Sequence, residues 1–141
     1  RFEREYNLLI ELPGVSAIVA CVILSEIGPN VEAFQSQGNL ASWAGVCPGS
    51  YESAGIKKSS HTTQGNKYLK SSLFQAGGTA GRSKDEAFHN LYARISGRSS
   101  KMKAIIACAH KMIRVIYKIL STGEHYDAKK ALGLRQQARA N

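Results

Sequence analysis

The sequence predicts an all-α protein, because apolar residues recur every three or four positions along most of the chain. Gly- and Pro-containing turns separate these patterns, and no stretch shows the strict alternation typical of a β-strand. A length of 141 residues with 43% hydrophobic residues suits a single compact domain with a core of its own.

The N-terminal part predicts two helices joined by a tight turn. The first is amphipathic and ends before Pro13-Gly14, a pair that does not continue a helix. Ser16 can start the second, which runs to about Ile27, is apolar on nearly all sides and is therefore expected to be buried. The apolar positions that mark the first helix are Phe2, Tyr6, Leu9 and Ile10.

The middle of the chain predicts a short helix over Asn39–Ala44, a long irregular loop over Val46–Gln64 and a helix over Lys67–Ala80. The loop is rich in Gly, Ser and Lys. The helix after it has an unusually small-sided face, which allows another helix to approach closely. That face consists of Leu69, Ser72, Leu73, Ala76 and Ala80.

Two further helices are expected over Asp85–Ile95 and Lys101–Leu120. Ser83 is the expected N-cap of the first, with Glu86 at the capping-box position. The second has the clearest amphipathic pattern, and the polar tail after Gly123 ends in a stretch that is expected to fray. Its apolar stripe comprises Met102, Ile105, Ile106, Ala109, Met112, Ile113, Ile116 and Leu120, and its cations Lys103, Lys111, Arg114 and Lys118 are expected to lie off that stripe.

The net charge of +9 is unevenly distributed. Residues 1–50 hold two basic and five acidic side chains, whereas residues 51–118 hold thirteen basic and three acidic ones. A basic second half indicates a polyanionic partner, most commonly nucleic acid, although a basic surface can also serve solubility alone. No apolar run is long enough to span a membrane, so no membrane partner is expected.

Cysteine and histidine show no metal-binding spacing. The three cysteines are widely separated, which is typical of reduced thiols in a cytoplasmic protein, with Cys21 and Cys108 on apolar helix faces. The four histidines and the scattered carboxylates form no recognisable metal set, so no metal site is expected in this chain.

The segment Leu8–Ile27 resembles the helix-hairpin-helix motif of DNA-binding proteins. A tight turn at Gly14 and Val15 would expose backbone N–H groups at Ser16, where a helix begins, and such groups bind phosphate oxygens. An ordinary αα-hairpin with a Pro-Gly turn is the alternative interpretation.

The stretch Ala41–Lys70 is the other candidate site. Ser53 lies just before Lys57 and Lys58, which could neutralise a phosphate, but no general base that would activate the hydroxyl can be identified. Ser50 is a competing hydroxyl. Two more residues of this stretch could contact nucleic acid, His61 at a phosphate and Tyr51 by stacking on a base.

Four motifs in order resemble the C-terminal domain of the insertion-sequence 110/116/902 transposase family. They are LPGVSAIVACVILSEIG, LASWAGVCPGSYESAG, KSSHTTQGNKYLKSSL and AIIACAHKMIRVIYKIL. The resemblance runs from about Leu12 to Tyr126. It implies that residues 1–11 are the end of a linking helix, residues 12–126 the DNA-binding and catalytic domain, and residues 127–141 a polar tail.

The resemblance also implies a chemistry. Family members are DNA recombinases whose N-terminal half is a Holliday-resolvase-like (RuvC-like) domain with acidic ligands for Mg²⁺, and whose C-terminal half supplies a serine that forms a phosphoserine link to DNA. A structured guide RNA and a homo-oligomer are implied as well. By motif the serine is Ser53 in YESAG and the hairpin residue is Gly14. The family's basic stretch falls on Lys57, Lys58, Lys67 and Lys70, and its Gly-Asn-Lys-Tyr-Leu run includes Asn66 and Tyr68.

The acidic, metal-binding half does not occur in this chain, which starts at Arg1 and is expected to be a fragment. By itself the fragment is expected to bind nucleic acid without cutting it, because the metal ligands are missing. Two other readings remain open: a non-catalytic helix-hairpin-helix module that binds nucleic acid, and a structural or oligomerising helical domain.

Overall fold

The computed structural model describes residues 2–28, 37–46 and 64–131, and over these residues it contains helices and no strand, which confirms the all-α prediction. No helix within these ranges is long and apolar enough to cross a membrane. The helices are α1 (Glu3–Leu9), α2 (Ala17–Ile27), α3 (Gln37–Ala44), α4 (Gln64–Gly81), α5 (Glu86–Arg98) and α6 (Lys101–Thr122).

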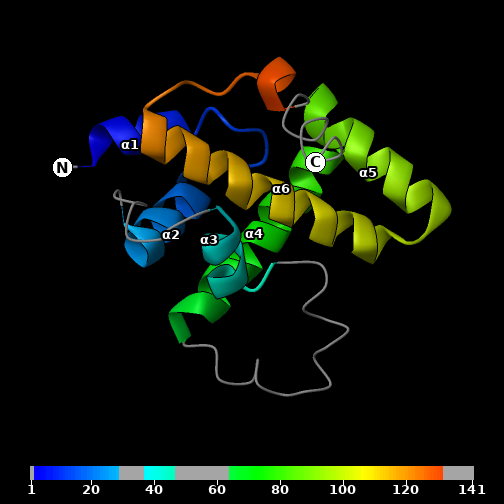
Figure 1. The fold of residues 1–141 in the computed structure, drawn as a ribbon, viewed down its shortest axis with the longest axis horizontal. Coiled ribbons are helices and arrows are strands. Elements are labelled where there is room, and N and C mark those ends of the chain that lie inside the picture. Colours follow the sequence, from blue (N-terminus) through cyan, green and yellow to red (C-terminus); the bar gives the residue numbers. More distant parts are fainter. Residues whose placement is uncertain (1, 29–36, 47–63, 132–141) are drawn as a thin grey trace.

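Helices α4 and α6 cross at the centre of the molecule and share its most extensive contact (Figure 1). α5 packs on both of them, and α3 and the α1–α2 pair cover other parts of the same two helices. The core therefore lies around the crossing. Its largest fully buried side chains are Phe88, Leu9, Ile23, Leu40, Leu69, Leu73, Met112, Ile113 and Ile116.

The small-sided face of α4 allows the close helix contact that its sequence predicts. Leu73 and Ala76 are fully buried there. A Cβ atom placed on Gly77 would lie 2.7 Å from the backbone nitrogen of Ala109 in α6, a distance that real Cβ atoms essentially never show. The two backbones can therefore meet only because residue 77 has no side chain.

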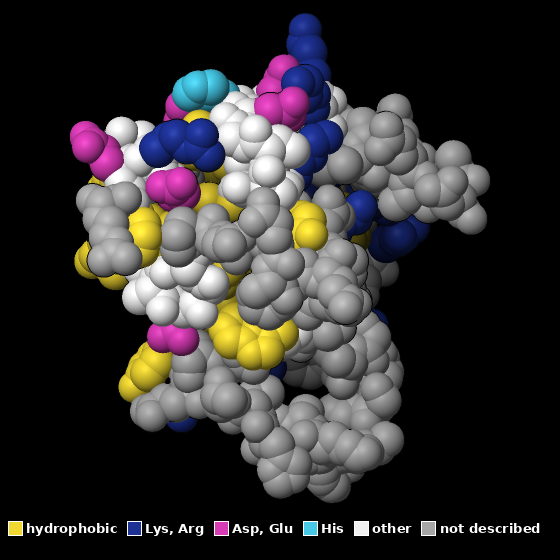
Figure 2. Space-filling view, turned by 60° about the vertical axis from the view of Figure 1, so that its left-hand side comes forward, with side chains coloured by type: hydrophobic (Ala, Val, Ile, Leu, Met, Phe, Trp, Pro, Cys, Tyr) yellow, Lys and Arg dark blue, Asp and Glu magenta, His cyan; other side chains and the backbone are white. Residues whose placement is uncertain are grey.

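The prediction that α2 is buried on all sides is wrong. Ile18 is 77% exposed and Cys21 is also exposed, because α2 packs mainly against α1 and α4, which cover only one of its faces. Phe2 and Ile10, which were expected on the apolar side of the first helix, flank α1 and are exposed as well. Figure 2 looks at this side of the molecule, where hydrophobic and acidic side chains reach the surface together.

The N-cap of α5 is Asp85 and not Ser83. An Asp85 carboxylate oxygen accepts hydrogen bonds from the backbone nitrogens of Ala87 (3.0 Å) and Phe88 (3.1 Å). The Ser83 hydroxyl instead closes the turn after α4, since it donates to the Ala80 carbonyl and accepts from the Asp85 nitrogen. Glu86 is therefore the first residue of α5, and the third is Phe88, which cannot complete a capping box.

α6 departs from its predicted stripe at two positions. Met102 is 59% exposed, because the first turn of α6 extends past the core. Lys111 is only 6% exposed, and its Nζ donates to the Ala131 carbonyl at 2.8 Å. The returning segment 123–131 covers this side of α6, so a cation that the helix pattern alone places off the apolar stripe is buried by tertiary packing.

The segment 123–131 also joins the two ends of the fold. The Tyr126 hydroxyl donates to the Asp85 carboxylate, with oxygen–oxygen distances of 2.8 and 3.0 Å. The adjacent His125 ring contacts the Glu11 carboxylate at 2.8 Å. Glu11 follows α1 and Asp85 precedes α5, so this segment fixes two distant parts of the chain to each other.

Candidate nucleic-acid interface

The two helices that flank the predicted loop, α3 and α4, pack against each other. α3 ends at Ala44 and is followed by Gly45, whose φ of +78° suits glycine, and by the fully buried Val46. The Val46 nitrogen donates to the Ala41 carbonyl at 3.1 Å, which fixes the direction in which the chain leaves α3. The chain therefore leaves α3 at a point that lies against α4 near Lys70.

Lys70 lies at this junction. A Cβ atom on Gly45 would be 3.3 Å from the Lys70 Cδ, so the lysine stem runs directly over the end of α3. The Lys70 Nζ lies 5.7 Å from the centroid of the Phe74 ring, within the range of a cation–π contact. A half-buried cation is therefore held next to the point where the predicted catalytic loop begins.

Lys67 lies on the exposed side of the same helix, next to Tyr68, which is 54% exposed. A cation beside an exposed aromatic ring can contact a phosphate and a base face of one nucleic acid strand. Reasoning from the residues alone selected Tyr51 for this stacking role and missed Tyr68. Its outward position could have been recognised from the sequence, because Leu69 and Leu73 fix the buried face of α4.

The predicted phosphate-binding hairpin is partly packed against α4 and partly exposed at the surface. Gly14 has a φ of +82°, and a Cβ atom there would collide with the Ala76 carbonyl oxygen of α4. Close packing against α4 therefore explains why residue 14 is a glycine. Val15 is buried, while Ser16 is exposed and caps α2 by accepting a hydrogen bond from the Val19 nitrogen at 3.3 Å. The start of α2 is at the surface, where an anion could reach it.

Most of the predicted catalytic loop lies outside the described residues. This holds for Ser53, the proposed nucleophile, and for Tyr51, Lys57, Lys58 and His61, whose roles stay predictions. The backbone of Asn66 lies in the first turn of α4, and its side chain is outside the described part. The structure thus places Lys70 against the end of α3, and Lys67 lies one turn earlier on α4. The hairpin residues Gly14–Ser16 precede α2, which also packs on α4.

Three more cations gather where α5 ends and α6 begins, a position that sequence reasoning did not select. Arg98 is in the last turn of α5, and Lys101 and Lys103 are in the first turn of α6. All three are exposed. The sequence carried a signal for them, because lysines without acidic neighbours are unusual at a helix start.

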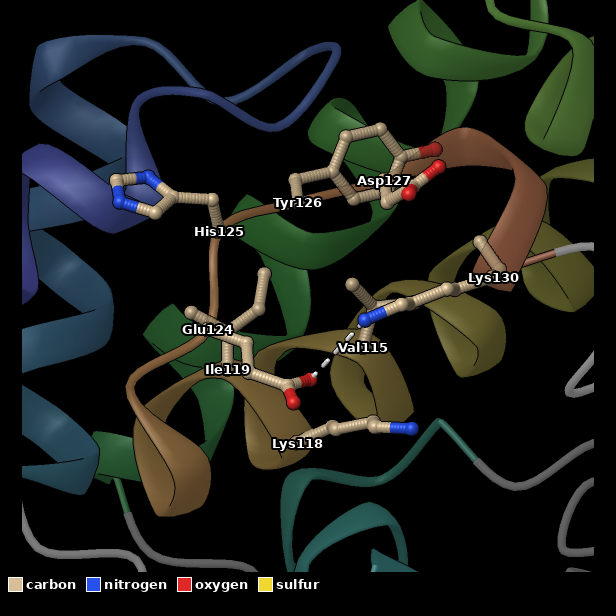
Figure 3. A pocket seen from close by; sticks show the side chains of 9 residues that line it. Val115, Lys118, Ile119, Glu124, His125, Tyr126, Asp127 and Lys130 are labelled. Carbon is tan, nitrogen blue, oxygen red and sulfur yellow. Dashed lines mark ion pairs between the residues drawn. The ribbon is translucent and has the colours of Figure 1, made fainter.

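The cavities found in the described structure do not form an alternative active site. Figure 3 shows one between the end of α6 and the segment 124–131, beside an ion pair between Glu124 and Lys130 at 3.9 Å. Its volume of about 30 Å³ is suited to a water molecule rather than a substrate. A wider groove of about 370 Å³ between α1 and α2 is lined by Phe2, Glu3, Tyr6, Cys21, Leu24 and Ser25, and has no cation for phosphate.

The described residues offer no fit for the Mg²⁺ that the family resemblance implies. Within residues 2–28, 37–46 and 64–131, no three His, Cys, Asp or Glu side chains lie close enough to hold a metal ion.

Two titratable groups of α6 have pKa values that are shifted toward the uncharged form. Burial raises the pKa of Cys108 to about 12, and burial, with a smaller contribution from Arg114, lowers the pKa of His110.

Comparison with known proteins identifies a family and several relatives that this chain is similar to. The family model described as "Transposase IS116/IS110/IS902 family" matches residues 6–93, which include the hairpin, the predicted loop and α4. The chain is 28% identical over 133 residues to the "Insertion element IS110 uncharacterized 43.6 kDa protein" of Streptomyces coelicolor. It is 30% identical over 127 residues to the "Pilin gene-inverting protein" of Moraxella bovis. It is 29% identical over 125 residues to the "Putative transposase y4pF/y4sB" of Sinorhizobium fredii.

These alignments cover 93%, 87% and 84% of this chain, but only 32%, 39% and 32% of the respective relatives. The chain thus spans about a third of the length of the curated relatives it matches. No solved structure gives a significant match. The family model covers well over half of the chain, from the end of α1 into α5. The chain therefore belongs to the IS116/IS110/IS902 transposase family.

Proposed function

We propose that this chain is the DNA-recombining domain of a transposase and that Ser53 is its nucleophile. The observation that carries the proposal is the family match over residues 6–93, which includes Ser53 and the basic residues after it. One relative is named a pilin gene-inverting protein, and the inversion of a gene is a rearrangement of DNA. DNA rearrangement is accordingly the activity that we propose for a protein of the relatives' full length that contains this sequence, called the longer protein below.

The described fold supports a strand-exchange site at the start of α4. Lys70 lies over the end of α3 and Lys67 lies one turn earlier on α4, so a DNA strand bound there would pass the point where the loop that holds Ser53 begins. Cations at this position would neutralise phosphate charge and position the strand, which is most of what phosphoryl transfer requires of a protein. Lys57 and Lys58 are proposed to act at the phosphate that is attacked.

The proposed step conserves the phosphodiester. The Ser53 Oγ loses its proton and attacks the phosphorus, and the displaced sugar oxygen leaves as a hydroxyl, so that the strand is held as a phosphoserine ester. A hydroxyl of the incoming strand then attacks the same phosphorus and releases Ser53. Mg²⁺, a structured guide RNA and a homo-oligomer are proposed for the longer protein. No step is assigned to the metal here, because the described residues do not hold it.

The proposal is tested by trapping the adduct. The longer protein, or this chain supplied with the remaining part of that protein, is incubated with Mg²⁺ and end-labelled DNA carrying the element's terminus, and covalent complexes are resolved under denaturing conditions. The Ser53→Ala variant is expected to form no adduct, while the neighbouring Ser50→Ala variant forms it at the wild-type level. An adduct that survives Ser53→Ala and disappears in Ser50→Ala would reassign the nucleophile.

A second candidate function, binding of nucleic acid without chemistry, is favoured by one observation: the start of α2 is exposed at Ser16, Ala17 and Ile18, where an anion could reach the backbone. In that case Ser53→Ala would change neither DNA binding nor any rearrangement by the longer protein. Loss of the adduct in Ser53→Ala, with retained binding, would exclude this candidate.

A further inference from the structure

A second stretch of unbalanced positive charge follows the predicted catalytic loop in the sequence. Residues 87–123 contain seven Lys or Arg side chains and no Asp or Glu. Three of these cations, Arg98, Lys101 and Lys103, gather in the exposed segment 97–103, which is called the α5–α6 tip below. Figure 1 shows that the tip projects from the side of the molecule opposite α1 and α2.

The three cations of the α5–α6 tip have no acidic partner within the part of the chain that the structure describes. The ion pairs found there involve Arg4, His125 and Lys130 instead. Outside those ranges the sequence holds only two further acidic side chains, Glu32 and Glu52. A cluster of like charges without counter-charges raises the local potential and attracts a polyanion.

Two of the cations lie where they oppose the folding of their own helix. Lys101 and Lys103 are in the first turn of α6, where the backbone dipole already presents positive charge, and that turn has no acidic residue. The first turns of α1 and α5 hold Glu3, Glu5 and Glu86, as helix stability favours. The tip therefore carries an electrostatic cost in the free protein that a bound anion would relieve.

The chemistry of the tip fits a phosphate backbone rather than bases. Segment 97–103, GRSSKMK, contains no aromatic residue that could stack on an unpaired base. Ser99 and Ser100 lie between Arg98 and Lys101, and the exposed Met102 lies between the two lysines. A Cβ atom on Gly97 would meet nothing within 4 Å, so a rigid strand can approach the backbone there. Cations on a narrow, protruding turn suit the two phosphate rows of a duplex.

We propose that the α5–α6 tip is a second DNA-docking surface, which grips the backbone of duplex DNA away from the strand that is cut. The proposal rests on DNA being the partner, as the proposed function has it, and adds a contact outside the loop and outside the hairpin. The tip holds the duplex through phosphates and reads no sequence, so target choice is left to other parts of the recombination complex.

The test measures salt-dependent binding of the full 141-residue chain to a fluorescent 30-base-pair duplex. The tip variant combines Arg98→Gln, Lys101→Gln and Lys103→Gln. The matched control combines Arg82→Gln, Lys84→Gln and Lys129→Gln, which removes three exposed cations elsewhere. Loss of three phosphate contacts should flatten the slope of log affinity against log salt by about 2.7. The control should change the slope by less than about 1.

If the wild type binds the duplex but the slope changes equally in the tip variant and the control, the docking surface is overturned and the proposed function is unaffected. No salt-sensitive binding by the wild type would remove the proposed function as well. A tip variant that loses affinity for duplex RNA and keeps its affinity for duplex DNA would also overturn the proposal. Misfolding is controlled by the melting temperature, and by the milder Lys101→Gln and Lys103→Gln pair, for which a slope change of about 1.8 is expected.

Discussion

The middle of α6 is buried and closely packed, whereas its first turn is exposed and charged. In the middle, Cys108 and Ala109 lie against Gly77 of α4 so closely that no side chain fits at residue 77. In the first turn, Lys101 and Lys103 are exposed, and the last glycine of α5, Gly97, faces open space. One helix thus serves as the centre of the core along most of its length and as a charged projection at its start.

This contrast separates stability from binding within a single element. The crossing of α4 and α6 is apolar and close-packed, so a change of one methyl group there affects the whole domain. The α5–α6 tip has few neighbours and an unfavourable charge arrangement, so changes there should affect a partner more than the fold. Three predictions test this difference, beginning with the largest effect on stability.

Gly77→Ala should destabilise the protein strongly. The new Cβ atom would lie 2.7 Å from the Ala109 nitrogen and 3.0 Å from its Cα, and backbone atoms cannot turn away as a side chain can. Forcing the helices apart should lower the free energy of unfolding by about 1–3 kcal/mol, measured by urea denaturation. A wild-type midpoint in this variant would show that α4 and α6 do not meet as described.

The matched control is Gly97→Ala in the tip, which replaces the same residue type in a helix. No neighbouring atom lies within 4 Å of the new Cβ, and alanine restricts the unfolded chain more than glycine does. The free energy of unfolding should therefore stay constant or rise by up to about 1 kcal/mol. If Gly97→Ala were as harmful as Gly77→Ala, the distinction between crossing and tip would fail.

Cys108 provides a pH test of the packing between α5 and α6, because its buried thiol donates to the Phe88 carbonyl of α5. Burial raises the pKa of its thiol from 9.0 to about 12, so the folded state keeps the proton while the unfolded state loses it above pH 9. The unfolded state then binds fewer protons, and stability should fall by about 1.4 kcal/mol for each pH unit between pH 9 and 12. Below pH 9 this contribution should be fully present.

The control for Cys108 is the Cys108→Ala variant, which has no thiol at this position. The stability difference between wild type and variant, measured by urea denaturation at pH 8.5 and pH 10, should become smaller at the higher pH. Parallel pH profiles would mean that the thiol ionises equally in both states, and hence that it is not buried against α5.

Lys101→Glu together with Lys103→Glu should stabilise the fold slightly. The two carboxylates would meet the positive end of the α6 dipole, and each should contribute about 0.3–1 kcal/mol at low ionic strength. The melting temperature should rise in low salt, and the gain should largely disappear in 1 M NaCl, where charges are screened. A lower melting temperature in low salt would indicate that the lysines have a structural role in the tip.

Much of the helical order could be predicted from the sequence. The apolar repeats located the helices found as α2 to α6 closely, and the small residues of α4 predicted a close helix contact without identifying α6 as the partner. The N-cap of α5 was misplaced because Ser83 and Asp85 are both good capping residues, and only the turn after α4 decides between them. Ser53 and its neighbouring lysines lie outside the described residues, so their arrangement stays a prediction.

The sequence by itself determined the fold class, the helix order and the basic second half, because periodicity and charge are local properties of the chain. Only the tertiary structure decided which faces are covered. It left Ile18 exposed where α2 has few neighbours, and it buried Lys111 under the segment that returns to α6. It also placed Arg98 beside Lys101 and Lys103 across a turn. Burial depends on which segments meet in space, and the periodicity of one helix does not contain that information.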